Sequence, residues 1–167
     1  MNKIAILYGS SGGSTESVAN RIKDKFDGKA DVFNVESVSV QAVQPYKYLI
    51  LGTSTTGIGD LQDDWEGFLP TFSSRMDFTD KTVAIFGLGD SGSFSDSFAE
   101  AIFALHDALK DKVKIVGEIP DEGYTYDDSL AVEDGKWLGL ALDEDNEYDD
   151  TEERLTKWVD QLKKEFV

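Results

Sequence analysis

Three short segments rich in glycine and hydroxyl residues hold the groups that could do chemistry. The first, Gly9–Thr15, has the sequence Gly-Ser-Ser-Gly-Gly-Ser-Thr and joins an apolar run to a helical pattern. Glycines admit positive φ angles, and successive backbone N–H groups at a helix N-terminus bind anions. The segment has no Lys before Ser14 and Thr15, as a nucleoside-triphosphate loop requires, and it lacks the G-x-G-x-x-G spacing of dinucleotide sites. We therefore predict a cradle for one monoester phosphate.

The other two segments, Thr53–Asp60 and Gly87–Asp96, each follow a later apolar run. The second of them contains Gly-Asp-Ser-Gly, which is suggestive of a serine nucleophile. A serine needs a general base, and the one histidine of the chain, His106, falls in the middle of a helical pattern. We therefore reject hydrolysis and expect His106 to lie on the surface or rim of a helix.

Composition excludes several further classes of function. The 167 residues include no Cys and one His, which excludes disulfides, thiolate nucleophiles, iron–sulfur clusters and multi-His metal sites. The formal net charge of −17 argues against nucleic acid or an anionic membrane as a partner. Asp143, Asp145 and Glu147 have the spacing of a calcium loop, but Tyr148 stands where that loop needs glycine. No apolar run approaches the ~18 residues of a membrane span, and no signal peptide precedes Ile4–Tyr8, so we expect a cytoplasmic protein.

Apolar runs that alternate with helical patterns must position these segments. The expected strands are Ile4–Tyr8, Val32–Val35, Tyr48–Leu51, Val83–Phe86 and Val113–Val116. The expected helices are Thr15–Phe26, Asp64–Ser73, Phe94–Leu109 and Asp150–Phe166. Continuous apolar strands are typical of a parallel sheet that is buried on both faces. Ligands of such sheets bind beyond the carboxyl ends of the strands, where all three segments fall.

This pattern predicts an α/β fold with a doubly wound, five-stranded parallel sheet in the order 2-1-3-4-5, forming a three-layer sandwich. The length suits a single domain over residues 1–167. One polar, acidic stretch, Pro120–Lys136, is followed by a second apolar run, Trp137–Leu142. We interpret it as a loop inserted at about residues 120–137 that interrupts the fifth strand; loops of that length are commonly functional.

The motifs together resemble the flavodoxin family, and the resemblance spans essentially the whole chain. Gly9–Glu16 resembles the phosphate loop of that family, Thr55–Phe68 its second flavin loop with the following helix, and Phe86–Phe98 its third loop. Gly135–Asn146 resembles the segment that follows the inserted loop of long-chain flavodoxins. The resemblance implies non-covalently bound FMN and low-potential one-electron transfer, without acid–base catalytic residues or substrate turnover.

The resemblance also implies a set of FMN-binding positions. The phosphate would be held by Ser10, Ser11, Gly12, Gly13, Ser14 and Thr15. One wall of the isoalloxazine slot would be formed by Thr55, Thr56, Gly57, Ile58 and Gly59. The other wall would be formed by Gly89, Asp90, Phe94, Asp96 and Ser97, and Asp145 would reach the ribityl chain.

Four positions depart from the family pattern. Gly12 and Ser14 replace a Thr and an Asn of the usual phosphate loop, and Thr56 replaces the Trp that usually stacks on the flavin. Phe94 stands in place of the usual Tyr and can still stack. An aromatic neighbour contributes about 0.5–1.5 kcal/mol beyond area burial, so Thr56 is expected to weaken FMN binding about tenfold without preventing it.

The excess of acidic residues affects the expected redox chemistry and the expected partners. Residues 117–167 hold 17 acids and 5 bases and so carry most of the excess. Negative charge near the flavin opposes its second reduction, because that step adds further negative charge. An acidic face would steer basic-surfaced redox proteins to the carrier, which we expect to be a monomer. Two alternatives stay open, a flavodoxin-like FMN enzyme such as a quinone reductase and an α/β binding or receiver domain without flavin.

Overall fold

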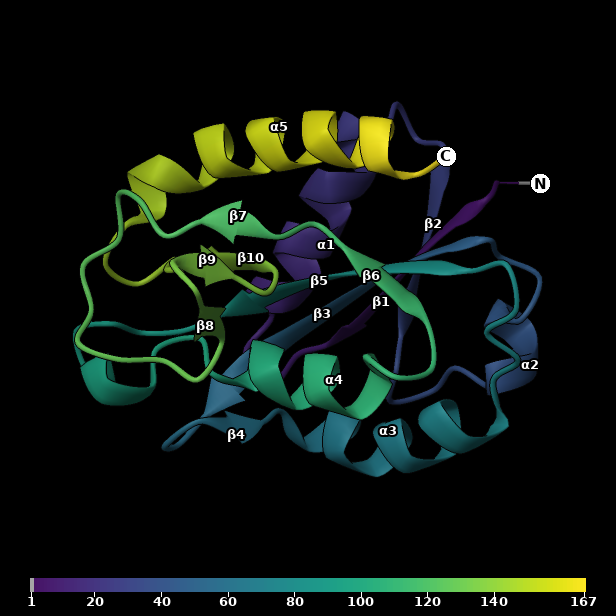
Figure 1. Cartoon of the computed structure of the whole chain (residues 1–167), viewed down its shortest axis with the longest axis horizontal. Coiled ribbons are helices and arrows are strands. Elements are labelled where there is room, and N and C mark those ends of the chain that lie inside the picture. The colour runs from purple at the N-terminus through teal and green to yellow at the C-terminus, as the bar shows by residue number, and fades with distance from the viewer. Residues whose placement is uncertain (1) are drawn as a thin grey trace.

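A parallel β-sheet forms the centre of the computed structural model, which describes residues 2–167 (Figure 1). Its strands lie in the order β2-β1-β3-β5, and two short strands, β6 and β10, share the last position beside β5. This is the predicted order. The bounds are β1 Ile4–Gly9, β2 Ala30–Asn34, β3 Tyr48–Thr56, β5 Thr82–Leu88, β6 Lys114–Val116 and β10 Leu140–Leu142, with β4 Asp60–Leu61 antiparallel to the end of β3.

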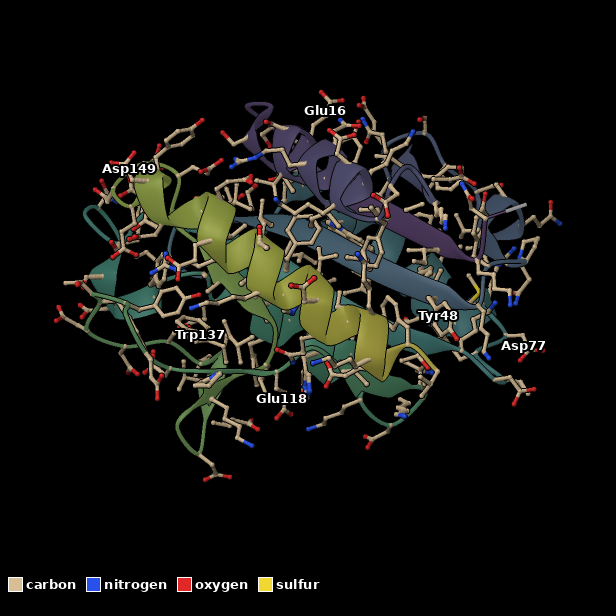
Figure 2. The ribbon with its side chains drawn as sticks, turned by 90° about the horizontal axis from the view of Figure 1, so that it is seen from above. Glu16, Tyr48, Asp77, Glu118, Trp137 and Asp149 are labelled. Atoms are coloured by element: carbon tan, nitrogen blue, oxygen red, sulfur yellow. The ribbon has the colours of Figure 1, made fainter. Side chains whose placement is uncertain are left out.

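Helices cover both faces of the sheet. Figures 1 and 2 show α1 and α5 side by side over one face, and Figure 1 shows α3 and α4 over the other. Alternate residues of β1 enter the two cores, with Ala5 and Leu7 on the α3–α4 side and Ile6 and Tyr8 on the α1–α5 side. The bounds are α1 Ser14–Lys25, α3 Asp63–Arg75, α4 Ala101–Leu109 and α5 Tyr148–Glu165; the short α2, Val40–Val43, was not predicted.

The last strand position is interrupted by the acidic segment. Lys114–Val116 pairs with the start of β5, and Leu140–Leu142 pairs with its end. The chain between them forms a second, three-stranded antiparallel sheet rather than only the irregular loop that was expected. Its strands are β7 Ile119–Pro120, β8 Val132–Glu133 and β9 Lys136–Trp137, in the order β7-β9-β8. Trp137, expected in the fifth strand, therefore belongs to this small sheet.

Aromatic packing fixes the inserted segment to the sheet edge. The ring of Trp137 lies 5.6 Å from that of Phe98, 5.4 Å from that of Tyr124 and 5.2 Å from that of Tyr126. The Tyr124 hydroxyl donates to the Ala141 carbonyl at 2.7 Å, which ties the insert to β10. The insert thus has its own core, and Phe98 from the third loop is part of it.

This packing corrects the prediction of a helix over Phe94–Leu109. A 3-10 turn spans Ser95–Ser97, and α4 begins only at Ala101. Ala99 lies in the left-handed region with φ 50°, which breaks the helical path. The Phe98 amide donates to the Asp128 carbonyl of the insert at 3.3 Å, and the Asp127 and Asp128 amides donate to the Ser95 carbonyl. Contacts with a distant segment therefore shape this stretch as a loop.

Candidate functional site

The three predicted segments meet at one cavity beyond the carboxyl ends of β1, β3 and β5. The cavity has a volume of about 290 Å³. Its lining comprises Ser10, Ser11, Gly12, Ser14, Thr15, Ser54, Thr55, Leu88, Gly89, Asp90, Phe94, Glu144 and Asp145. Of the predicted site residues, Gly13, Thr56, Gly57, Ile58, Gly59, Asp96 and Ser97 are not part of this lining.

The first loop presents backbone N–H groups and hydroxyls around the start of α1. Gly13 precedes the helix with φ 92°, a left-handed conformation that favours glycine, and its amide donates to Ser10 Oγ at 3.0 Å. Ser11, Gly12 and Ser14 are exposed toward the cavity, and Thr15 is buried. The amides of the first helical turn have no partners inside the helix, so this end of α1 suits an anion.

Gln62 supports this loop through a hydrogen bond, and the sequence did not predict this role. It is 1% exposed, and its Oε1 accepts from the amides of Asp64 and Trp65, capping α3. Its Nε2 donates to Ser11 Oγ at 3.1 Å. A Cβ at Gly9 would lie 2.2 Å from this Oε1, so the glycine is required for the contact. A polar residue just before a predicted helix was the only signal available in the sequence.

The second loop is a β3–β4 hairpin whose first residues, Ser54 and Thr55, line the cavity. Gly57 and Gly59 have φ angles of 53° and 81°, and Ile58 between them is 80% exposed. The Thr55 hydroxyl accepts from the Ala101 amide at 3.2 Å and so anchors the start of α4. The hairpin therefore offers an apolar side chain and a glycine-rich backbone at the edge of the cavity.

The third loop is held by carboxylates that accept hydrogen bonds. Asp90 Oδ1 accepts from the amides of Gly92 and Ser93, both at 3.1 Å, and from Asn146 Nδ2 at 2.7 Å. The Asn146 hydrogen bond is the main cause that lowers the pKa of Asp90. Phe94 follows, 40% exposed and facing the cavity. Asp96 is exposed and Ser97 is buried, and both lie away from the lining.

Asp143, at the end of β10, joins this loop to the last strand and was considered in the sequence only as part of a rejected calcium pattern. Its carboxylate is fully buried. One oxygen accepts from the Ser91 hydroxyl and amide, and the other accepts from the amide and side chain of Asn146. A buried carboxylate with this many donors fixes the loop rather than reacting.

The cavity is strongly acidic. Carboxylate oxygens of Asp90, Asp143 and Asp145 lie within 4.8 Å of one another. Desolvation and then the charges of Asp90 and Asp143 raise the pKa of Asp145. Among the described residues 2–167, no Lys or Arg lines the cavity. A negative charge added here would meet the carboxylates of Asp90 and Asp145, whereas the third carboxylate of the lining, Glu144, is paired with Arg21 at 3.0 Å.

His106 does not reach this site. It lies in α4, partly buried, and burial lowers its pKa below the usual value. Its partly buried place in α4 agrees with the expected position on the surface or rim of a helix.

Within residues 2–167, no helix combines the length and the apolar character needed to cross a bilayer.

The fold and the cavity define a class of doubly wound α/β proteins that bind a phosphorylated ligand beyond the carboxyl ends of the parallel strands. Comparison with known proteins narrows the class. The flavodoxin family matches residues 6–158, and the chain belongs to this family.

Curated and solved relatives cover the whole chain. The chain is 43% identical to a flavodoxin of Helicobacter pylori over 100% of both chains. It is 40% identical to flavodoxin 1 of Azotobacter vinelandii, over 100% of this chain and 99% of the relative. The crystal structure of Fusobacterium nucleatum flavodoxin bound to flavin mononucleotide superposes with a TM-score of 0.91 at 32% identity, over 99% of both chains.

Proposed function

We propose that this protein is an FMN-dependent electron carrier that shuttles single electrons between redox enzymes and turns over no substrate of its own. The observation that carries the proposal is the convergence of the three loops on one cavity that begins at the N-terminus of α1. Membership of the flavodoxin family supports the same reading. No observation favours the alternative of a quinone reductase.

The first loop fits the phosphate of FMN. Its hydroxyls and the free amides at the start of α1 supply donors, and the absence of a lysine suits a single phosphate rather than a triphosphate. Gly13 has the left-handed φ that such a loop needs, while Gln62 fixes the Ser11 hydroxyl. We assign the phosphate to Ser10, Ser11, Gly12, Gly13, Ser14 and Thr15.

The second and third loops fit the two walls of a flat ring system. Thr55, Thr56, Gly57, Ile58 and Gly59 would cover one face of the ring, with the exposed Ile58 as the apolar contact. Phe94, Gly89 and Asp90 would form the other wall, with Asp145 near the ribityl chain. Asp96 and Ser97 lie outside the cavity lining, so any contact they make would come from their backbone.

FMN, when bound, would accept two electrons in successive one-electron steps. The charged side chains around the cavity would set the reduction potentials of these steps. Asp90 and Asp145 line the cavity together with Glu144, which Arg21 neutralises at 3.0 Å, and no Lys or Arg among the described residues lines the cavity itself. The second electron adds negative charge to this surrounding, so we expect it to enter at low potential.

The test of the proposal is FMN uptake followed by a reductive titration. The apoprotein should take up one FMN per chain, become yellow and accept electrons in two resolved one-electron steps. A protein that does not bind added FMN would contradict the proposal. Sustained NAD(P)H consumption with a quinone would favour the enzyme alternative.

Thr56→Trp is expected to tighten FMN binding about tenfold, because an indole on the exposed hairpin adds a stacking surface that Thr56 does not offer. Fluorescence quenching of FMN by apoprotein measures the dissociation constant. Thr56→Val adds no ring and should change the constant by no more than about twofold. Equal constants for the Trp and Val variants would show that the hairpin does not face the flavin.

We further propose that basic-surfaced redox partners dock on an acidic face around the cavity. Exposed acids occur in the segments next to the cavity: Asp63 follows Gln62, Asp96 lies in the third loop, and the amide of Asp127 donates to Ser95. Charge of one sign at a docking face speeds association with a partner of the other sign, and the gain is lost as salt screens it.

The second-order rate of electron transfer to a basic c-type cytochrome should therefore fall by about tenfold or more between 0.01 and 0.5 M salt. Stopped-flow measurement at matched driving force provides the rate. The double variant Asp63→Asn/Asp127→Asn should lower the low-salt rate, whereas Asp111→Asn, just after α4 at the far end of that helix, should not. A rate independent of salt would remove the docking proposal and leave the FMN assignment untouched.

The single domain, the monomeric state and the cytoplasmic location stay predictions.

A further inference from the structure

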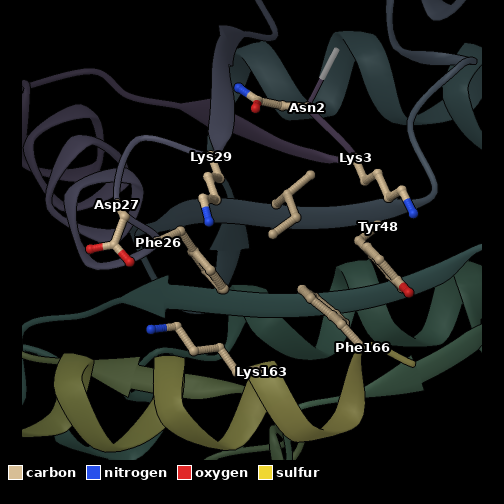
Figure 3. Close-up of a pocket in the computed structure, with 9 residues that line it drawn as sticks. Asn2, Lys3, Phe26, Asp27, Lys29, Tyr48, Lys163 and Phe166 are labelled. Atoms are coloured by element: carbon tan, nitrogen blue, oxygen red, sulfur yellow. The ribbon is translucent and has the colours of Figure 1, made fainter.

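A second cavity lies at the opposite ends of the strands from the proposed FMN site. It has a volume of about 430 Å³ and is lined by the starts of β1 and β3, the end of α1 and the last residues of the chain (Figure 3). Ile4 and Tyr48 open the two strands whose other ends lead to the FMN loops. Because β1 spans six residues, the two cavities lie roughly 20 Å apart along the strand.

The floor of this cavity is aromatic. The rings of Tyr48 and Phe166 stack with centroids 4.6 Å apart and an interplanar angle of 12°. Phe26 adds a third ring, and Ile4 adds an aliphatic side chain to the lining. Pockets of small organic ligands have volumes of about 300–1,000 Å³ and apolar linings with a few polar groups, and this cavity fits that description.

The rim of the cavity is basic, although the chain carries a net charge of −17. Lys3, Lys29 and Lys163 all line it, and within residues 2–167 none of them forms an ion pair. Figure 3 shows Lys29 and Lys163 on either side of Phe26, with the Lys163 ammonium 6.0 Å from the centre of that ring. Asp27 is the one acid in the lining, so the rim keeps a positive excess.

We propose that this cavity binds a small aromatic carboxylate. Its ring would rest on the Tyr48, Phe26 and Phe166 side chains, and its carboxylate would face the ammonium groups of the rim. The aromatic floor disfavours a fully hydrated anion such as inorganic phosphate, and three unpaired ammonium groups disfavour a neutral hydrocarbon.

The test is a titration of the FMN-loaded, ¹⁵N-labelled protein with 2-naphthoate, followed by amide chemical shifts. Saturable shifts should appear at Phe26, Lys29, Tyr48 and Phe166, and not at the loop Ser10–Thr15. The neutral 2-naphthamide, which has the same ring, should bind about fivefold or more weakly. Use of the FMN-loaded protein keeps the probe out of the flavin site.

Two variants test whether the ammonium groups at the rim of the cavity contribute to binding. Lys29→Gln/Lys163→Gln removes two exposed ammonium groups without disturbing the core, and it should weaken naphthoate binding by about fivefold or more while leaving the affinity for the amide unchanged. Lys136→Gln, an exposed lysine on β9, is the matched control and should not alter binding. Shifts confined to other parts of the molecule, equal affinity for naphthoate and naphthamide, or no effect of the double variant would each overturn the proposal.

Discussion

Gly9→Ala is expected to abolish tight FMN binding and to lower the free energy of unfolding by about 2–3 kcal/mol. The added Cβ would lie 2.2 Å from Gln62 Oε1 and 2.7 Å from Trp65 Cδ1. Neither side chain can move freely, because Gln62 caps α3 and holds Ser11, and the buried Trp65 donates from Nε1 to the Gly52 carbonyl at 2.7 Å. The methyl group must therefore displace either the first turn of α3 or the phosphate loop.

Two measurements separate these outcomes, namely urea unfolding of the apoprotein and FMN titration. Gly12→Ala is the matched control, because a Cβ there meets no atom within 4 Å and φ is not positive. It should leave the stability of the apoprotein within about 0.5 kcal/mol of the parent. If Gly9→Ala unfolds at the same urea concentration as Gly12→Ala and binds FMN as the parent does, Gln62 does not organise the loop.

Asp143→Ala is expected to lower the free energy of unfolding by about 3 kcal/mol, because it removes a buried carboxylate on which several donors depend. The Ser91 hydroxyl and the Asn146 side chain would lose their shared acceptor. Asn146 also donates to Asp90, so the third loop should loosen at the cavity. FMN affinity should fall together with stability.

Asp145→Ala is the comparison variant for Asp143→Ala, because Asp145 also lies just after the end of β10. Asp145 is exposed, and desolvation and the charges of its two neighbours raise its pKa, so its removal relieves repulsion. Stability should stay the same or rise slightly, which thermal unfolding at pH 7 would show. A larger loss for Asp145→Ala than for Asp143→Ala would refute the view that Asp143 fixes the loop.

Most of the cavity lining could be predicted because its parts are local. The phosphate loop needs only glycines and hydroxyls between a buried strand and a helix, and Gly9–Thr15 has them in seven consecutive residues. Apolar runs that alternate with helical patterns indicate a parallel sheet, and a parallel sheet brings its loops to one edge. The central strand order follows from the same rules of connection, and the structure confirms it.

The remaining parts depend on residues far apart in the chain. Gln62 reaches Ser11 across 51 positions and Asp143 reaches Ser91 across 52, and no local pattern records such pairs. The apolar residues of Phe94–Leu109 do recur with helical spacing. The first part of this stretch is nevertheless a loop, because the inserted segment contacts Phe98 and Ser95.

The sequence by itself therefore determined the order of the central strands, the three loops and the acidic character of their surroundings, because each depends on composition or short-range period. Only the tertiary structure decided which buried side chains hold those loops in place and how the insert is folded. The basic cavity at the other end of the sheet belongs to the same category, since Lys3, Lys29 and Lys163 come together only when the two ends of the chain pack beside the end of α1.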